Sequence, residues 1–239
     1  MSKHKPPRPF TAPSHPLFEP LLALYETLAS PPPSEVRVCH DCGRGCMSRK
    51  EVAKLLKGPS GRLSAKLLYS WYFSALNTEP SRAMQRYLLP RILDAMVAEE
   101  DVEQLGQPLR RFKAVSEPDA WREEQWRALK DLIYAYWRHL GETERSGGRD
   151  LQDAFEHLVA GGWVAEELLR ATMDWPVELC LQIHAMGFYQ FEDLWRHEAG
   201  AALRRRIEAL ATGEGPLQAD AAYVLSDLPE LPDLPDLPE

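Results

Sequence analysis

Three of the four cysteines are crowded into one short segment, CHDCGRGC, over residues 39–46. Two cysteines separated by two residues can place both thiolates on one tetrahedral zinc ion, and the glycines allow the loop to fold around it. Cys39, Cys42 and Cys46 are therefore candidate metal ligands. For the fourth ligand the sequence offers three candidates: His40, Cys180 and His184. The alternative is a reduced cluster that packs as small apolar side chains, because no second Cys-x-x-Cys pair occurs.

Cysteine usage and the lack of a long apolar run predict the cellular setting of the chain. Cys180 stands alone, which is a poor layout for a disulfide framework. Lys3, Lys5 and Arg8 are followed by prolines instead of the apolar stretch of a signal peptide. No window approaches the ~20 apolar residues that span a bilayer. We therefore expect a cytoplasmic protein with reduced thiols and no membrane partner.

No arrangement of residues in the sequence predicts catalysis. The Gly-x-Ser-x-Gly, His-Glu-x-x-His and glycine-rich phosphate-binding motifs are absent from the sequence, and its histidines lie far apart. We expect a protein that is not an enzyme and that has no cofactor apart from the zinc considered above. A formal net charge of -8 argues against a nucleic-acid partner. The only dense basic run, Arg204-Arg205-Arg206, would be spread around a helix and indicates a solvated face.

Two tryptophans and a leucine repeat are candidate partner contacts. Trp163 follows a Gly-Gly pair and Trp175 precedes a proline, and tryptophan at an exposed helix end is a frequent hot spot of binding. Residues 226–239 read SDLPELPDLPDLPE, and proline at every third position favours polyproline II, which aligns the leucines along one edge. These leucines are Leu228, Leu231, Leu234 and Leu237. The segment is either a solvated acidic tail or a strip that docks on a basic surface.

The elements that must position these residues are all predicted to be helices. Apolar residues recur at intervals of three and four in residues 16–30, 48–58, 63–77, 80–98, 121–140, 151–160, 164–173, 176–186 and 191–210. Ser48 and Glu51 form a capping-box pattern before the second of these segments. Pro90 lies inside another and should kink or divide that helix. No stretch combines strand alternation with a hairpin turn.

These patterns predict an all-α fold. Short helices in succession, each with one wide apolar face, favour an irregular stack of antiparallel helix pairs, either a helical bundle or a short array that resembles an α-solenoid. We expect a flexible Pro-rich lead over residues 1–15, a single helical domain over residues 16–225 and an acidic Leu-Pro tail over residues 226–239.

Part of the chain resembles an uncharacterised family of bacterial all-helical proteins. The resemblance rests on CHDC at residues 39–42, LLKGPSGRLSAKLLYSWYFSALNT at residues 55–78 and RYLLPRILDAM at residues 86–96. The stretches WREEQWRALKDLIYAYW (121–137) and DLQDAFEHLVAGG (150–162) are similar to later helices of that family. The third cysteine and the Leu-Pro tail depart from its pattern. The resemblance implies a helical fold and a bacterial origin, and it implies no activity.

These observations predict a non-catalytic module that binds another protein. One version is an immunity or antitoxin-like protein that neutralises a bacterial toxin, because an acidic surface attracts a basic partner. The alternative is a zinc-binding enzyme or regulator built on Cys39, Cys42 and Cys46.

Overall fold

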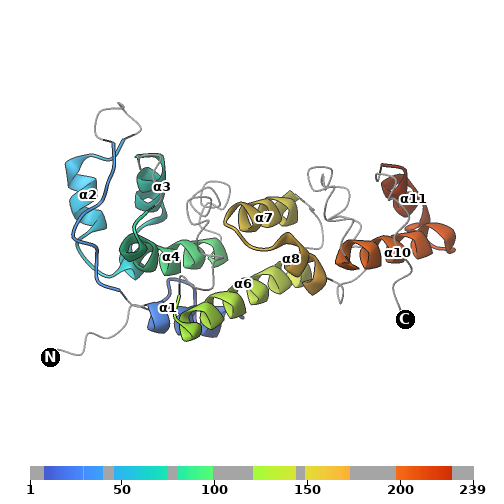
Figure 1. Cartoon of the computed structure of the whole chain (residues 1–239), viewed down its shortest axis with the longest axis horizontal. Helices are drawn as coiled ribbons and strands as arrows, with labels where there is room; N and C mark the ends of the chain where they lie inside the picture. Colours follow the sequence, from blue (N-terminus) through green and yellow to red (C-terminus); the bar gives the residue numbers. More distant parts are fainter. Residues whose placement is uncertain are drawn as a thin grey trace. The chain divides into compact units, whose positions relative to one another are not determined.

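The computed structural model of the chain describes residues 8–28, 30–39, 46–74, 80–98, 121–143, 149–172 and 198–227, with the backbone alone at 149–153, 198–199 and 227. Every regular element in these ranges is a helix, so the predicted all-α fold class is confirmed (Figure 1). None of the described helices is both long and apolar enough to cross a membrane.

The α-helices carry the labels of Figure 1 and have the following bounds: α1 Phe18–Leu28, α2 Arg49–Leu55, α3 Ala65–Ser74, α4 Arg82–Val97, α6 Glu123–Thr143, α7 Arg149–Ala160, α8 Ala165–Ala171, α10 Glu198–Thr212 and α11 Gln218–Asp227. A short 3-10 helix, η2 (Ser60–Arg62), lies between α2 and α3. Most predicted segments match these bounds to within a few residues. The helix predicted over residues 176–186 lies outside the described ranges, and α11 was not predicted.

Contacts within the chain divide it into two compact units, where the sequence predicted a single helical domain. Unit 1 consists of residues 1–136 and 157–162, and unit 2 consists of residues 137–156 and 163–239. Each unit has its own buried apolar side chains, as the two following paragraphs describe.

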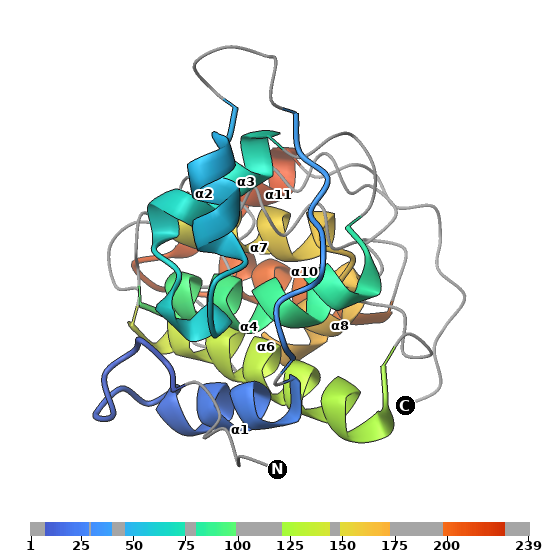
Figure 2. The same cartoon turned by 90° about the vertical axis from the view of Figure 1, so that its left-hand side faces the viewer.

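Unit 1 is built around α4, which lies between α1 on one side and the neighbouring α2 and α3 on the other (Figures 1 and 2). Every side chain from Tyr87 to Val97 is buried, so α4 has no solvent-exposed face over three turns. Pro90 does not divide this helix, which is continuous from Arg82 to Val97. A helix buried on all sides must satisfy its own polar side chains internally, and α4 carries two ionisable ones, Arg91 and Asp94.

Unit 2 is held together by aromatic packing and by a helix pair. The Trp137 indole N–H donates a hydrogen bond to the Leu168 carbonyl over 3.0 Å, and its ring centroid lies 5.8 Å from that of Phe155. The helices α10 and α11 pack together and bury Leu203, Ile207, Ala221 and Val224.

Candidate functional site

Three polar side chains of α4 lie on one helix face and hold three other segments of unit 1. Tyr87, Arg91 and Asp94 are spaced by four and three residues, which places them on the same side of a helix. All three are fully buried. Their partners lie in the lead, in α1 and at the two ends of the segment that joins α2 to α3.

Tyr87 fixes the end of α2. Its hydroxyl oxygen lies 2.7 Å from the Leu55 carbonyl and 2.6 Å from the Gly58 carbonyl, so its single proton is shared between two acceptors. Both carbonyls belong to the last turn of a helix and its exit, where no intrahelical donor remains. Burial raises the pKa of Tyr87 to about 12, because the phenolate would lose its hydration.

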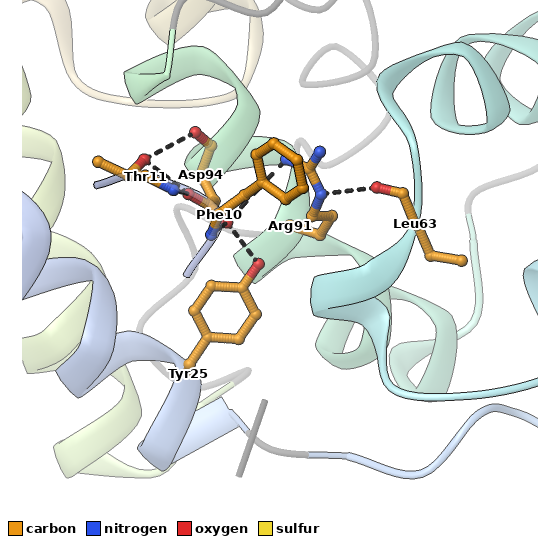
Figure 3. A network of polar contacts seen from close by, with 6 residues as sticks. All are labelled: Phe10, Thr11, Tyr25, Leu63, Arg91 and Asp94. Atoms are coloured by element: carbon orange, nitrogen blue, oxygen red, sulfur yellow. Dashed lines mark hydrogen bonds and ion pairs between the residues drawn. The ribbon is translucent and has the colours of Figure 1, made fainter. Parts of the chain in front are cut away.

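Arg91 fixes the start of α3. Its Nε donates to the Leu63 carbonyl over 2.7 Å, two residues before the helix begins (Figure 3). The guanidinium also lies beneath the Phe10 ring, 5.1 Å from the ring centroid, in the geometry of a cation–π contact. An exposed phenyl ring, 66% accessible, thus covers a fully buried cation.

Asp94 holds the lead and α1 (Figure 3). Its carboxylate accepts from the backbone N–H groups of Phe10 (2.6 Å) and Thr11 (3.0 Å), from the Thr11 hydroxyl (2.7 Å) and from the Tyr25 hydroxyl (2.9 Å). Four hydrogen bonds and a guanidinium at 4.0 Å compensate for the lost hydration of this buried charge. Residues 10 and 11, which the composition assigned to a flexible lead, are therefore attached to the core of unit 1.

Ser74 brings the two ends of the cysteine segment together at the end of α3. The Cys39 N–H donates to the Ser74 carbonyl over 2.6 Å, and the Met47 N–H donates to the Ser74 hydroxyl over 2.5 Å. Ser74 is fully buried, so this closure forms part of the core.

The described cysteines differ in oxidation state. Cys39 is disulfide-bonded, whereas Cys46 is free and partly exposed. The prediction of reduced thiols is therefore wrong for Cys39, because spacing along the chain does not determine which thiols meet in space. A metal site needs the thiolate form of its cysteines. Cys42 lies outside the described ranges, and within those ranges no three His, Cys, Asp or Glu side chains are grouped as metal ligands.

The outer face of α2 is basic. At 100° per residue, Arg49, Lys50 and Lys54 fall on the side of the helix opposite the buried Leu55, and Lys57 follows just past the end. All four of these cations are exposed. Tyr87 therefore holds the apolar side of α2 toward α4, and this orientation turns the basic side outward.

The outer face of α3 combines a cation with an aromatic cluster. Lys66, Tyr69 and Phe73 are spaced by three and four residues and share the solvent side of the helix. The Phe73 ring is 52% exposed, with its centroid 4.4 Å from that of Tyr69 and 4.9 Å from that of Tyr72. The opposite side of α3 buries Leu68 and Trp71.

The two helix faces share one electrostatic environment. We call the combined region the basic–aromatic surface, and it consists of Arg49, Lys50, Lys54, Lys57, Arg62, Lys66, Tyr69, Tyr72 and Phe73. Glu51 is the single acidic residue between positions 46 and 74. Its pKa is lowered first by hydrogen bonds from the Ser48 backbone and side chain, and then by the charges of Lys54 on α2 and Lys66 on α3. The charges of Lys54 and Lys66 therefore both act on the Glu51 carboxylate.

Several exposed cations of the described helices are paired within their own helix, whereas no ion pair is found for those of the basic–aromatic surface among the described residues. Arg127, Arg170 and Arg204 each form an ion pair with a glutamate four residues away on the same helix, at 2.7, 2.9 and 3.0 Å. None of the six cations of the basic–aromatic surface forms an ion pair with a described residue. The positive charge of this surface is therefore available to a partner.

The sequence did not predict this surface. Composition over the whole chain gives a net charge of -8, and this average conceals six basic residues against one acidic residue between positions 46 and 74. The interpretation of Arg204-Arg205-Arg206 as the only dense basic run missed these cations because they are not consecutive. A local charge count combined with helical spacing was the signal that could have found them.

The predicted partner contacts are described only in part. Trp163 is buried, with 6% of its surface exposed, so the exposure expected at this helix end is not found. Gly162, which precedes it, adopts a φ of 97°, a left-handed conformation that favours glycine. Trp175 and the leucines at 228, 231, 234 and 237 lie outside the described ranges.

Comparison with protein-family models, curated proteins and solved structures found no significant match. The resemblance to a bacterial helical family therefore stays a prediction.

Proposed function

We propose that this chain is a non-catalytic binding module that docks an acidic segment of a protein partner on the basic–aromatic surface. The observation that carries the proposal is the exposed Phe73 ring, which packs with two tyrosines on α3 and shares the solvent side of that helix with Lys66. Aromatic side chains and arginine are enriched at protein interfaces, and lysines at the rim of an interface attract carboxylates.

The ring geometry favours a peptide over a nucleic acid. The Tyr72 and Phe73 rings meet edge to face at 89°, and those of Tyr69 and Phe73 are tilted by 54°. Bases stack on open, flat ring faces, whereas a tilted cluster presents a ridged apolar surface suited to aliphatic and proline side chains. The overall charge of -8 also opposes a long polyanion such as DNA.

The side chains of this surface are suited to binding an acidic segment of a partner. Lysines and arginines attract carboxylates, and the aromatic rings supply apolar area at a low cost in side-chain entropy. Glu51 already accepts hydrogen bonds from the Ser48 backbone N–H and hydroxyl as part of the helix cap. The net charge of -8 favoured a basic toxin as the partner. That prediction concerns the acidic residues outside the basic–aromatic surface, and it stays a prediction.

The test compares two matched double variants. Lys66→Glu with Phe73→Ala changes one cation and one exposed ring of the surface. Arg138→Glu with Tyr223→Ala changes an exposed cation and a 68% exposed ring outside it. Partners crosslinked to the unaltered chain in its native cells are identified by mass spectrometry, purified and titrated against all three chains.

We expect an identified partner with an acidic contact segment, whose Kd rises at least tenfold, or about 1.4 kcal/mol, with the surface variant. The control variant should bind within about threefold of the unaltered chain, as surface changes away from a contact usually do. A partner that binds the surface variant and the unaltered chain equally well would show the proposal to be wrong.

A further inference from the structure

The cysteine segment has a disulfide sulfur at one end and a free thiol at the other. Cys39 is disulfide-bonded, and Cys46 is free. The chain has two further cysteines, Cys42 and Cys180, so the partner of Cys39 is one of these. We propose that Cys39 and Cys46 form a thiol–disulfide exchange site that reacts with low-mass thiols and disulfides. This activity does not depend on the basic–aromatic surface.

Ser74 holds the two ends of the cysteine segment near each other. The Cys39 N–H donates to the Ser74 carbonyl over 2.6 Å. Met47, which directly follows Cys46, donates its N–H to the Ser74 hydroxyl over 2.5 Å. Both hydrogen bonds end on one buried residue, so the two cysteines stay close while unit 1 is folded. Reacting groups that are held in this way have a higher effective concentration than groups joined only through a flexible chain.

The two cysteines lie where the buried chain reaches the surface. Val38 and Met47, which flank the segment, are both buried. Cys39 and Cys46 are themselves partly exposed. An external thiolate or disulfide can therefore approach them, whereas a disulfide enclosed in a core is shielded from exchange.

The exchange needs no net oxidation. The Cys46 thiolate attacks the Cys39 sulfur, a Cys39–Cys46 bond forms, and the bond between Cys39 and its original partner breaks. The original partner leaves as a thiolate, so one thiolate is consumed and one is formed. When both cysteines begin as thiols, glutathione disulfide is the oxidant. Cys46 then displaces one glutathione and Cys39 displaces the second, which leaves the Cys39–Cys46 disulfide and two reduced glutathiones.

The charges that follow Cys46 favour an anionic reactant. Arg49 and Lys50 are both exposed at the start of α2. Glu51, the single acidic residue between positions 46 and 74, accepts hydrogen bonds from the Ser48 N–H and hydroxyl. This local charge should attract a thiol that carries carboxylates, such as glutathione, more than a cationic thiol such as cysteamine.

The first experiment measures how readily the two cysteines pair. Two full-length chains both carry Cys42→Ser and Cys180→Ser. One keeps Cys39 and Cys46, and the matched control moves the second thiol to the far end of α2 through Cys46→Ser with Lys57→Cys. Each chain is equilibrated with reduced and oxidised glutathione, quenched in acid, alkylated and mapped by peptide mass, which gives the effective concentration of one thiol at the other. Circular dichroism verifies that each chain is folded.

We expect the Cys39–Cys46 pair to have an effective concentration about tenfold or more above that of the control, because only the former is held by Ser74. Adding Ser74→Ala to the first chain should lower this value by about threefold or more, since the Met47 N–H loses its acceptor. Glutathione disulfide should oxidise the pair faster than cystamine does, when each rate is divided by the rate for a free cysteine peptide.

The unaltered chain provides a second measurement that needs no variant. In glutathione buffer, mass mapping should find the Cys39–Cys46 link beside the original pairing. Absence of this link at every ratio of reduced to oxidised glutathione would overturn the exchange. Equal effective concentrations in the first chain and the control would overturn the positioning by Ser74. Disulfide-linked dimers through Cys46 would assign its thiol to a contact between copies of the chain, and faster relative oxidation by cystamine would overturn the charge selection.

Discussion

Arg91 and Asp94 lie one turn apart on α4 with 4.0 Å between the Arg91 Nη1 and a carboxylate oxygen of Asp94, yet each makes its hydrogen bonds to a different part of unit 1. Arg91 donates to the Leu63 carbonyl before α3, and Asp94 accepts from residues 10 and 11 and from Tyr25 of α1. This buried pair of opposite charges therefore links the start of α3, which carries part of the basic–aromatic surface, to the lead, which Asp94 holds.

Replacing Asp94 should destabilise the chain strongly. Asp94→Ala leaves two backbone N–H groups and two hydroxyls without their acceptor and removes the nearest negative charge from the buried Arg91. We expect a loss of about 3–5 kcal/mol in the free energy of unfolding, measured by urea denaturation. The matched exposed control, Asp131→Ala on α6, should change it by about 0.5 kcal/mol or less.

Tyr87 should make α2 sensitive to alkaline pH. Burial raises the folded pKa to about 12 from an ordinary 10, so its contribution is complete below pH 10 and is lost as pH rises toward 12. We expect α2 amide protection to decrease over that interval in the unaltered chain. Tyr87→Phe should remove this pH dependence and cost about 1 kcal/mol of stability at neutral pH. An unchanged alkaline profile in Tyr87→Phe would contradict the assignment.

Glu51 should make the stability of α2 decrease at acid pH. Its pKa is lowered, first by the Ser48 hydrogen bonds, so the stabilisation is present above the unfolded pKa near 4.5 and is lost as pH falls through the lower folded value. Glu51→Gln keeps a cap acceptor without the charge. We expect the amide protection factors of α2 in the Glu51→Gln variant to stay constant through the acid range, whereas those of the unaltered chain decrease there.

Association of an acidic peptide with the basic–aromatic surface should depend on salt. Raising the salt concentration from 0.1 to 1 M shortens the Debye length from ~10 to ~3 Å. We expect the association rate constant for a synthetic acidic peptide that binds this surface, measured by stopped flow with the full chain, to fall at least tenfold. The dissociation rate should change less, because apolar contact with Phe73 is not screened. Rates that stay constant over this range would remove electrostatic attraction from the proposal.

The cysteines should differ in reactivity. Without reductant, iodoacetamide should label Cys46 and leave Cys39 unlabelled, because a disulfide sulfur is not a thiolate. After reduction, peptide mass mapping should find Cys39 labelled as well. The reduced chain is also the form in which the zinc alternative is testable, by elemental analysis against Cys39→Ser with Cys42→Ser. Labelling of Cys39 in the untreated chain would contradict the disulfide.

Local patterns in the sequence predicted the local structure well. Ser48 and Glu51 form both hydrogen bonds of the predicted capping box, and the apolar spacing located most described helices. Pro90 was expected to kink or divide its helix, but α4 is not divided. Burial of α4 on all sides favours one continuous helix, because its packing outweighs the single hydrogen bond that proline removes.

The polar contacts that support the basic–aromatic surface could not be read from sequence. Asp94 meets Phe10 and Thr11 across more than eighty residues of chain, and no periodicity encodes such a pairing. The helix α11 was missed because its short stretch of small and apolar residues, QADAAYVLSD, has little amphipathic contrast. The basic face of α2 could be found by helical spacing, but only if charge is counted locally instead of over the whole chain.

The three polar residues on one face of α4, Tyr87, Arg91 and Asp94, also determine when the basic–aromatic surface can form during synthesis. Every hydrogen-bond partner described for the Tyr87, Arg91 and Asp94 side chains precedes α4 in the chain, from residue 10 to residue 63. A ribosome releases those segments first, so α2 and α3 emerge before the helix that orients them. A nascent chain that stops before residue 97 therefore exposes the cations and the rings without fixed geometry, and the binding surface is completed only when the last turn of α4 leaves the ribosome.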